Sequence, residues 1–220
     1  MKQIILSGFV LLASLAGVAQ TAGSAKAGSV AEAKSYKSEL GYSFAYPQDW
    51  VLMDTGASLP EVKQQAADEA KSDEGKQSAN CAQMDMTLRH VSASGMIVAM
   101  ALPFACYGQK LAPQDLAGFG GSVASGLSQA FDVQFSLTKT YRLGSHDLWV
   151  ERDQATAKAD ASQSFLVETV CGLLDKAAVC WVGIVKDESD LATFENTAIT
   201  LESDKPVGLV PAGVFTAGKP

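Results

Sequence analysis

Aromatic and small residues alternate in an early segment of the chain. Tyr42, Phe44 and Tyr46 are each separated by one small residue, so their rings leave the same face of an extended strand. Pro47 fixes its own φ and keeps the residue before it extended, and Trp50 begins an apolar return segment. The pattern predicts an opening β-hairpin. Because each ring can bury a large area, we expect the sheet to be built on this segment.

Further pairs of apolar or alternating segments predict antiparallel strands, at Ala82–Val91 with Met96–Phe104, at 133–143 with 148–153, and in the two halves of Phe165–Lys186. The run Met96–Leu102 is apolar at every position. Such a run is typical of a central strand that is covered on both faces.

Apolar residues at spacings of three and four predict helices over 58–71, over 113–131 and from Ser189 onward. The last of these is expected to present Leu191, Phe194, Ala198 and Leu201 on one face. The polar stretch Ser72–Asn80 predicts a mobile loop. The segment 205–220, with three prolines and three glycines, predicts an irregular C-terminal tail.

The order of these elements groups strands into hairpins, which favours antiparallel pairing. We therefore expect an α+β fold: an antiparallel β-sheet with helices packed on both faces, that is, an α/β/α sandwich. The predicted fold is a single domain over residues 35–204, a length that suits one hydrophobic core.

The N-terminus has the features of a secretory signal. A charged start precedes the apolar run Ile4–Ala16, and Gly17-Val18-Ala19 has the small residues of a cleavage site. The apolar run is shorter than the ~20 residues that a membrane span needs. We expect a signal peptide over 1–19, a flexible leader over 20–34, and an exported protein, periplasmic or extracellular, without a membrane span after cleavage.

The charge balance bears on the partner. The chain has 17 Lys and Arg against 24 Asp and Glu, a formal net charge of −7. Binding to phosphate backbones needs clustered basic residues, so nucleic acid is not an expected partner. We expect a protein partner in the cell envelope.

Four cysteines follow the signal segment: Cys81, Cys106, Cys171 and Cys180. An even number in an exported chain indicates two disulfides, although four cysteines allow three pairings. A two-residue turn at Asp175 and Lys176 places Cys171 opposite Cys180, and the preceding hairpin brings Cys81 to Cys106 at its open end. We favour these two pairs. Metal-binding or redox thiols are the alternatives, but no CxxC spacing supports them.

Candidate chemistry is sparse. Ser145-His146-Asp147 are consecutive in a predicted turn, whereas a catalytic triad is assembled from distant positions. His90 follows two methionines on its strand, an arrangement that could suit copper(I), but methionines on an apolar face are more often core residues. We therefore predict no catalytic residue, no metal and no cofactor. A hydrolase remains open if His90 or His146 meets a Ser or a carboxylate from a distant segment.

The segment Leu40–Trp50, which contains an aromatic-Tyr-Pro-x-x-Trp motif, and the sequence Asp190-Leu191-Ala192-Thr193-Phe194 in the last helix resemble the PsbP/DcrB-like superfamily. The resemblance extends to the order of the elements. It implies an α/β/α sandwich around an antiparallel sheet. It also implies a role like those of the superfamily, which includes photosystem accessory subunits, a small-GTPase-binding factor and bacterial envelope proteins. The superfamily has no shared catalytic motif, so it implies no catalytic residue here.

These observations favour an exported, non-catalytic binding or accessory protein of the cell envelope. Its expected contact surface is the tail through Phe215 or the loop at 72–80. Two alternatives stay open: a small-molecule or lipid carrier with a cavity beneath the helix at 59–71, and the hydrolase that uses His90 or His146.

Overall fold

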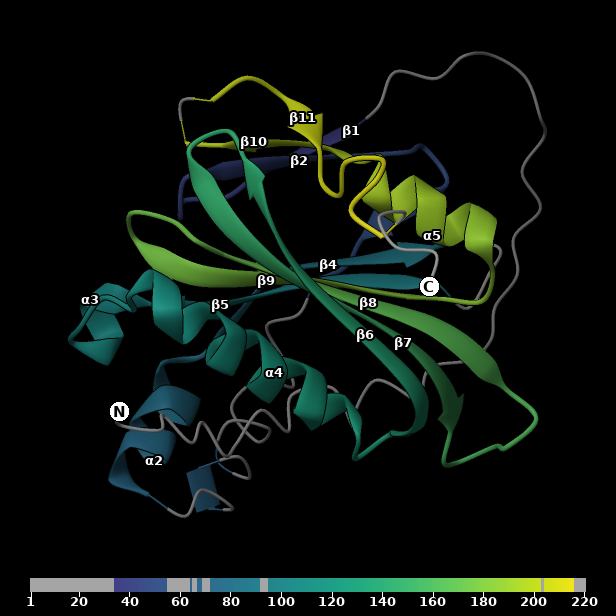
Figure 1. Ribbon diagram of the computed structural model, residues 1–220, viewed down its shortest axis with the longest axis horizontal. Coiled ribbons are helices and arrows are strands. Elements are labelled where there is room, and N and C mark those ends of the chain that lie inside the picture. The colour runs from purple at the N-terminus through teal and green to yellow at the C-terminus, as the bar shows by residue number, and fades with distance from the viewer. Residues whose placement is uncertain are drawn as a thin grey trace.

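The computed structural model describes residues 34–54, 64, 67–68, 72–91, 95–202 and 204–215, and these form two antiparallel sheets. The larger sheet has the order β3-β4-β5-β9-β8-β7-β6, and the smaller has the order β1-β2-β10-β11. Figure 1 shows the smaller sheet stacked on one side of the larger sheet and helix α4 on the other. The signal segment that we expect at 1–19 lies outside the described residues, as does most of the helix expected over 58–71.

The large sheet contains β3 (Trp50–Leu52), β4 (Gln83–His90), β5 (Met96–Pro103), β6 (Phe131–Leu143), β7 (His146–Ala157), β8 (Ser164–Leu173) and β9 (Ala177–Val185). The small sheet contains β1 (Lys34–Lys37), β2 (Tyr42–Tyr46), β10 (Ala198–Leu201) and β11 (Val207–Gly208). The helical elements are α2 (Asp73–Cys81), α3 (Phe104–Tyr107), the 3₁₀ turn η2 (Pro113–Asp115), α4 (Leu116–Leu127) and α5 (Glu188–Glu195).

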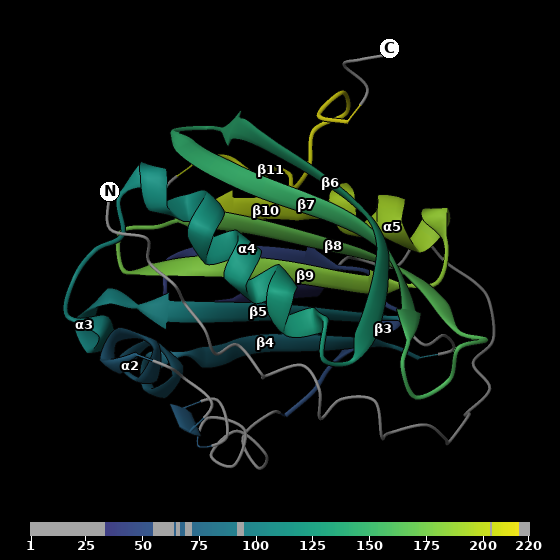
Figure 2. The same cartoon turned by 60° about the horizontal axis from the view of Figure 1, so that its bottom comes forward.

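One core lies between α4 and the large sheet. Figure 2 shows α4 crossing this face obliquely. Its residues Phe119, Val123 and Leu127 are buried against the sheet, as the spacing predicts. Gly120 faces the indole of Trp149 on β7, so the helix backbone comes close to the strand.

A second core lies between the two sheets. The rings of β2 and Trp50 are buried there with Trp181 of β9 and with Leu191 and Phe194 of α5. The second face of the large sheet is therefore covered by the small sheet together with α5, and not by helices alone. Strand β5 lies between β4 and β9 with Ile97–Leu102 buried, so the prediction of a central strand is confirmed.

The predicted opening hairpin is wrong in its pairing, although its rings do form core. Strand β2 pairs with β1 and β10, whereas β3 pairs with β4 in the other sheet. The turn after Tyr46 at Pro47 carries the chain from one layer to the next, and the Trp50 amide donates to the Pro47 carbonyl at 3.2 Å. The rings of β2 pack on the face of the large sheet, so β2 and β3 belong to two stacked sheets. The alternation of side chains is the same for stacked sheets as for two strands paired within one sheet.

Three other expectations need correction. Residues 73–81 form helix α2 and not a loop, because Ser72 caps the helix by accepting from the Gly75 amide and Gln77 binds the Tyr107 carbonyl on α3. The last helix ends at Glu195, and Ala198–Leu201 form strand β10 beside β2. The tail begins with strand β11 and buries Leu209 and Val210.

Candidate functional site

The turn between β6 and β7 meets the connection between β10 and β11 at one end of the molecule. Gly144 adopts φ +59°, and a β-carbon at this position would overlap the carboxylate of Asp204. The hydroxyl of Ser145 donates to the same carboxylate at 3.4 Å. A side chain at position 144 would displace Asp204, so glycine is needed there both for the turn and for the contact.

His146 lies behind this contact with only 11% of its side chain exposed. Its Nδ1 is 3.2 Å from the carbonyl oxygen of Leu173. Its Nε2 is 3.7 Å from Asp204 Oδ2 and 4.0 Å from Glu202 Oε2. The imidazole is thus hydrogen-bonded through Nδ1 to a backbone carbonyl, whereas the buried Nε2 faces two carboxylates beyond hydrogen-bond distance and has no hydrogen-bonding partner among the described residues.

Glu202 is held in an unusual backbone conformation beside His146. Its φ is +53°, in the left-handed region that residues other than glycine rarely adopt. The Glu202 amide donates to the Gly41 carbonyl at 2.5 Å, and Oε1 accepts from the Asp175 amide at 2.7 Å. These contacts compensate for the backbone cost, and such strained positions are common at functional sites.

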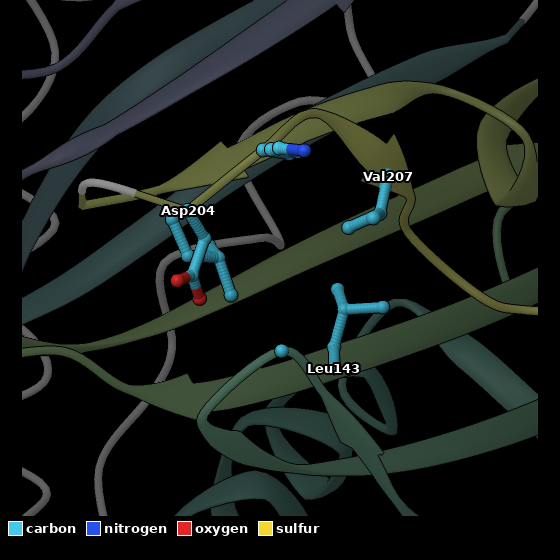
Figure 3. Close-up of a pocket in the computed structure, with 6 residues that line it drawn as sticks. Leu143, Asp204 and Val207 are labelled. Atoms are coloured by element: carbon cyan, nitrogen blue, oxygen red, sulfur yellow. The ribbon is translucent and has the colours of Figure 1, made fainter.

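A pocket of about 160 Å³ opens beside these residues, and it is lined by Leu143, Gly144, Leu201, Asp204, Lys205 and Val207. Figure 3 shows Leu143 and Val207 facing one another across the gap. The pocket therefore has apolar walls, and its lining also includes the carboxylate of Asp204 and the side chain of Lys205. Its volume suits a single side chain and is well below the roughly 300–1,000 Å³ of pockets that enclose a drug-sized ligand.

The arrangement around His146 does not form a nucleophile–base pair. A triad requires the hydroxyl to bond to the imidazole, whereas the Ser145 hydroxyl donates to Asp204. The consecutive residues 145–147 thus act as a polar turn. Asp204, which was not among the predicted site residues, accepts from the Ser145 hydroxyl and lies 3.7 Å from His146 Nε2.

His90 also has a carboxylate partner from a distant segment, which is the condition set above for the hydrolase alternative, so that alternative stays open at His90. Its Nε2 is 3.0 Å from Asp49 Oδ2, and its ring packs edge-on against Trp50 at 5.2 Å. The copper alternative is not supported by the positions of the methionines. Met86 lies in the core between the sheets, whereas Met84, Met96 and Met100 lie in the core under α4. Met84 and Met86 face opposite sides of β4 because a bulge lies between them.

The structure contains the disulfides Cys81–Cys106 and Cys171–Cys180. The first joins the end of α2 to α3, and the second joins directly opposed positions of β8 and β9. These are the pairs that the strand register predicts. No group of His, Cys, Asp and Glu among the described residues is arranged to hold a metal ion.

A cluster of charged residues that the sequence analysis did not select lies in the core between the sheets. Glu168 of β8 is fully buried, and its Oε2 accepts from Arg152 of β7 at 2.8 Å. Arg152 also pairs with Glu195 of α5 and lies 4.1 Å from the ring centre of Phe215. A lone glutamate on the apolar face of Leu166 and Val170 was the available signal.

No protein-family model matches the chain, and no curated protein matches it in sequence. Among solved structures, the chain is similar to the solution structure of cyanobacterial PsbP (CyanoP) from Synechocystis sp. PCC 6803. That similarity has a TM-score of 0.43 and 10% identity, and it covers 78% of this chain and 89% of that chain.

None of the helices in the described parts of the chain is long and apolar enough to cross a membrane. The carrier alternative predicts a cavity beneath the helix at 59–71, and most of those residues lie outside the described part of the chain. The carrier hypothesis is therefore untested.

Proposed function

We propose that this chain is an exported, non-catalytic accessory protein that binds a protein partner in the cell envelope, and that the partner places a basic side chain in the pocket between Leu143 and Val207. The observation that carries the proposal is the combination of apolar walls with the Asp204 carboxylate in a pocket sized for one side chain.

Lysine and arginine suit such a pocket because their aliphatic stems pack on apolar surface while their charged ends seek a carboxylate. Leu143, Leu201 and Val207 supply the apolar contact. Asp204 supplies the negative charge, and Glu202 lies near the same imidazole nitrogen of His146. Lys205 in the lining carries one positive charge, which these two carboxylates outnumber. The net charge of −7 favours the approach of a basic partner.

The remaining features support a binding role in an oxidising compartment. Two disulfides are typical of exported proteins. The hydroxyl and the imidazole nearest the pocket both face Asp204, an arrangement that orders the turn and leaves no activated nucleophile there.

The test uses ¹H–¹³C NMR of the disulfide-bonded protein with two capped tripeptides, acetyl-Leu-Arg-Leu-amide and its norleucine counterpart. We expect the arginine peptide to shift the methyl signals of Leu143, Leu201 and Val207. Asp204→Asn should weaken binding about tenfold, which corresponds to about 1.4 kcal/mol.

Glu188→Gln is the matched control, because it removes one carboxylate from an exposed position at the start of α5 and should leave binding unchanged. Equal binding of the two peptides, or methyl shifts confined to other parts of the molecule, would overturn the proposal.

A further inference from the structure

The segment after β10 is fixed by hydrogen bonds to β6, to α5 and to the residue before β10. The hydroxyl of Tyr141 on β6 donates to the Leu209 carbonyl at 2.7 Å. The Leu209 amide donates to the Thr197 carbonyl at 3.0 Å, and the Val210 amide donates to the Glu195 carbonyl at 2.9 Å. We call residues 207–215 the C-terminal strap.

Phe215, in the strap, contacts the charged cluster around the buried Glu168. Phe215 lies over the guanidinium of Arg152, which pairs with Glu168 and Glu195. Glu195 thus contacts both parts, since its carboxylate binds Arg152 and its carbonyl accepts from the strap. The side chains that meet here come from β6, β7, β8, α5 and the strap itself.

Glu168 is the unusual member of this cluster. Its side chain has no solvent exposure, and its Oε1 has no hydrogen-bonding partner among the described residues. Burial, opposed by Arg152 and reinforced by the charge of Glu195, raises the pKa of Glu168 to about 8. Tyr141 is also partly buried. Its burial, together with the charges of Glu168 and Glu195, raises the pKa of Tyr141, so the phenol stays protonated and can donate its hydrogen bond to the strap.

We propose that Glu168 and Arg152 form a pH-sensitive latch, in which loss of the Glu168 proton releases the C-terminal strap. With Glu168 protonated, one guanidinium balances the single carboxylate of Glu195. When Glu168 loses its proton to solvent, the carboxylates of Glu168 and Glu195 both face the one guanidinium of Arg152. The buried Glu168 Oε1 is then charged and needs a water molecule as a hydrogen-bond donor. Phe215 of the strap covers the guanidinium of Arg152, so its release opens a path for water to the buried Glu168.

Release of the strap also affects the pocket, because Val207 lies in the strap and forms one wall. This consequence rests on the proposed function, whereas the latch itself does not. Ligand binding at the pocket should therefore weaken at high pH.

The first measurement is amide hydrogen exchange in the full disulfide-bonded protein, corrected for the intrinsic pH dependence of exchange. Between pH 6.5 and 9 we expect the Val210 and Val214 amides to exchange at least tenfold faster than the correction predicts. Glu168→Gln keeps a neutral group at this position and should abolish that excess, while Glu188→Gln should retain it. ¹³C NMR of the Glu168 carboxyl should show a midpoint well above the ordinary carboxyl range.

A second variant keeps the test decisive if Glu168→Gln folds poorly. Phe215→Leu removes the ring from Arg152 and should release the strap at lower pH. Titration of Glu168 in the ordinary carboxyl range, or an unchanged exchange transition in Glu168→Gln, would overturn the latch.

The arginine tripeptide then tests the coupling between the latch and the pocket. Its affinity should fall at least fivefold from pH 6.5 to 9 in the wild type and not in Glu168→Gln. If the peptide binds at no pH, the proposed function fails, and the exchange data alone decide the latch.

Discussion

The backbone of α4 at Gly120 lies directly against the indole ring of Trp149 on β7, so that a β-carbon at position 120 would overlap the ring. The contact sets how closely the helix approaches the large sheet. A related contact exists on the other face, where a β-carbon at Gly183 would lie 2.9 Å from the ring of Phe194 on α5. Helices α4 and α5, on opposite faces of the large sheet, thus each approach it closely at a point where a glycine faces an aromatic ring.

Gly120→Ala should destabilise the protein by about 2 kcal/mol, because the Trp149 ring is buried and has to move. Gly118→Ala is the matched control, since a β-carbon there meets nothing within 4 Å. It should stabilise the helix by roughly 0.5–1 kcal/mol. Urea unfolding of both variants measures the difference, and equal effects would show that α4 does not pack as described.

Tyr42→Phe tests the contact between the two sheets. The buried Tyr42 hydroxyl donates to Asp85 Oδ2 at 2.6 Å, and Asp85 lies at the bulge in β4. Burial, with the nearby Asp85, raises the pKa of Tyr42, so the phenol remains a donor. Loss of this bond to a charged acceptor should cost about 2 kcal/mol of unfolding free energy.

Tyr36→Phe provides the comparison for this measurement. Tyr36 donates to the backbone carbonyl of the same Asp85 at 2.6 Å and is more exposed. Its removal should cost about 1 kcal/mol or less. A larger loss for Tyr36→Phe than for Tyr42→Phe would contradict the assignment of Tyr42 as the buried link.

Local patterns predict most strands but not their distribution between sheets. The alternation at Tyr42–Tyr46 correctly places the rings on one buried face. The alternation does not show which strands pair with β2. One of them is β10, which lies more than 150 residues later in the sequence. The segment Ala198–Leu201 fits helical spacing and strand alternation equally well, so pairing with β2 decides its conformation.

The candidate site was harder to predict because it is assembled from separate connections. His146 was visible in the sequence, but Glu202 and Asp204 lie in a segment whose position depends on β10 and β11. The turn at Asp175 joins them only after β8 and β9 pair. The two disulfides were predictable because strand register alone determines one pair and hairpin length the other.

The disulfide pairs can be checked chemically. A non-reduced digest should give peptides that link Cys81 to Cys106 and Cys171 to Cys180, separated by 25 and 9 residues. From the lengths of the closed loops, removal of the first pair should cost about 3.5 kcal/mol and removal of the second about 2.5 kcal/mol. Detection of Cys106 linked to Cys171 would contradict the register of both hairpins.

The stability of the protein should fall as pH rises, owing to Glu168. Because its folded pKa is raised to about 8, the folded state keeps a proton that the unfolded state loses near 4.5, the ordinary pKa of a glutamate. The stabilisation from this group is fully present below the unfolded pKa and is lost as pH rises through the folded pKa. Between pH 4.5 and 8 the loss should amount to roughly 2–4 kcal/mol. The measurement is the difference between wild type and Glu168→Gln in urea unfolding across this range, because other titrating groups cancel in the difference. A difference that does not change with pH would show that Glu168 is ionised in the folded protein, held as a carboxylate by Arg152.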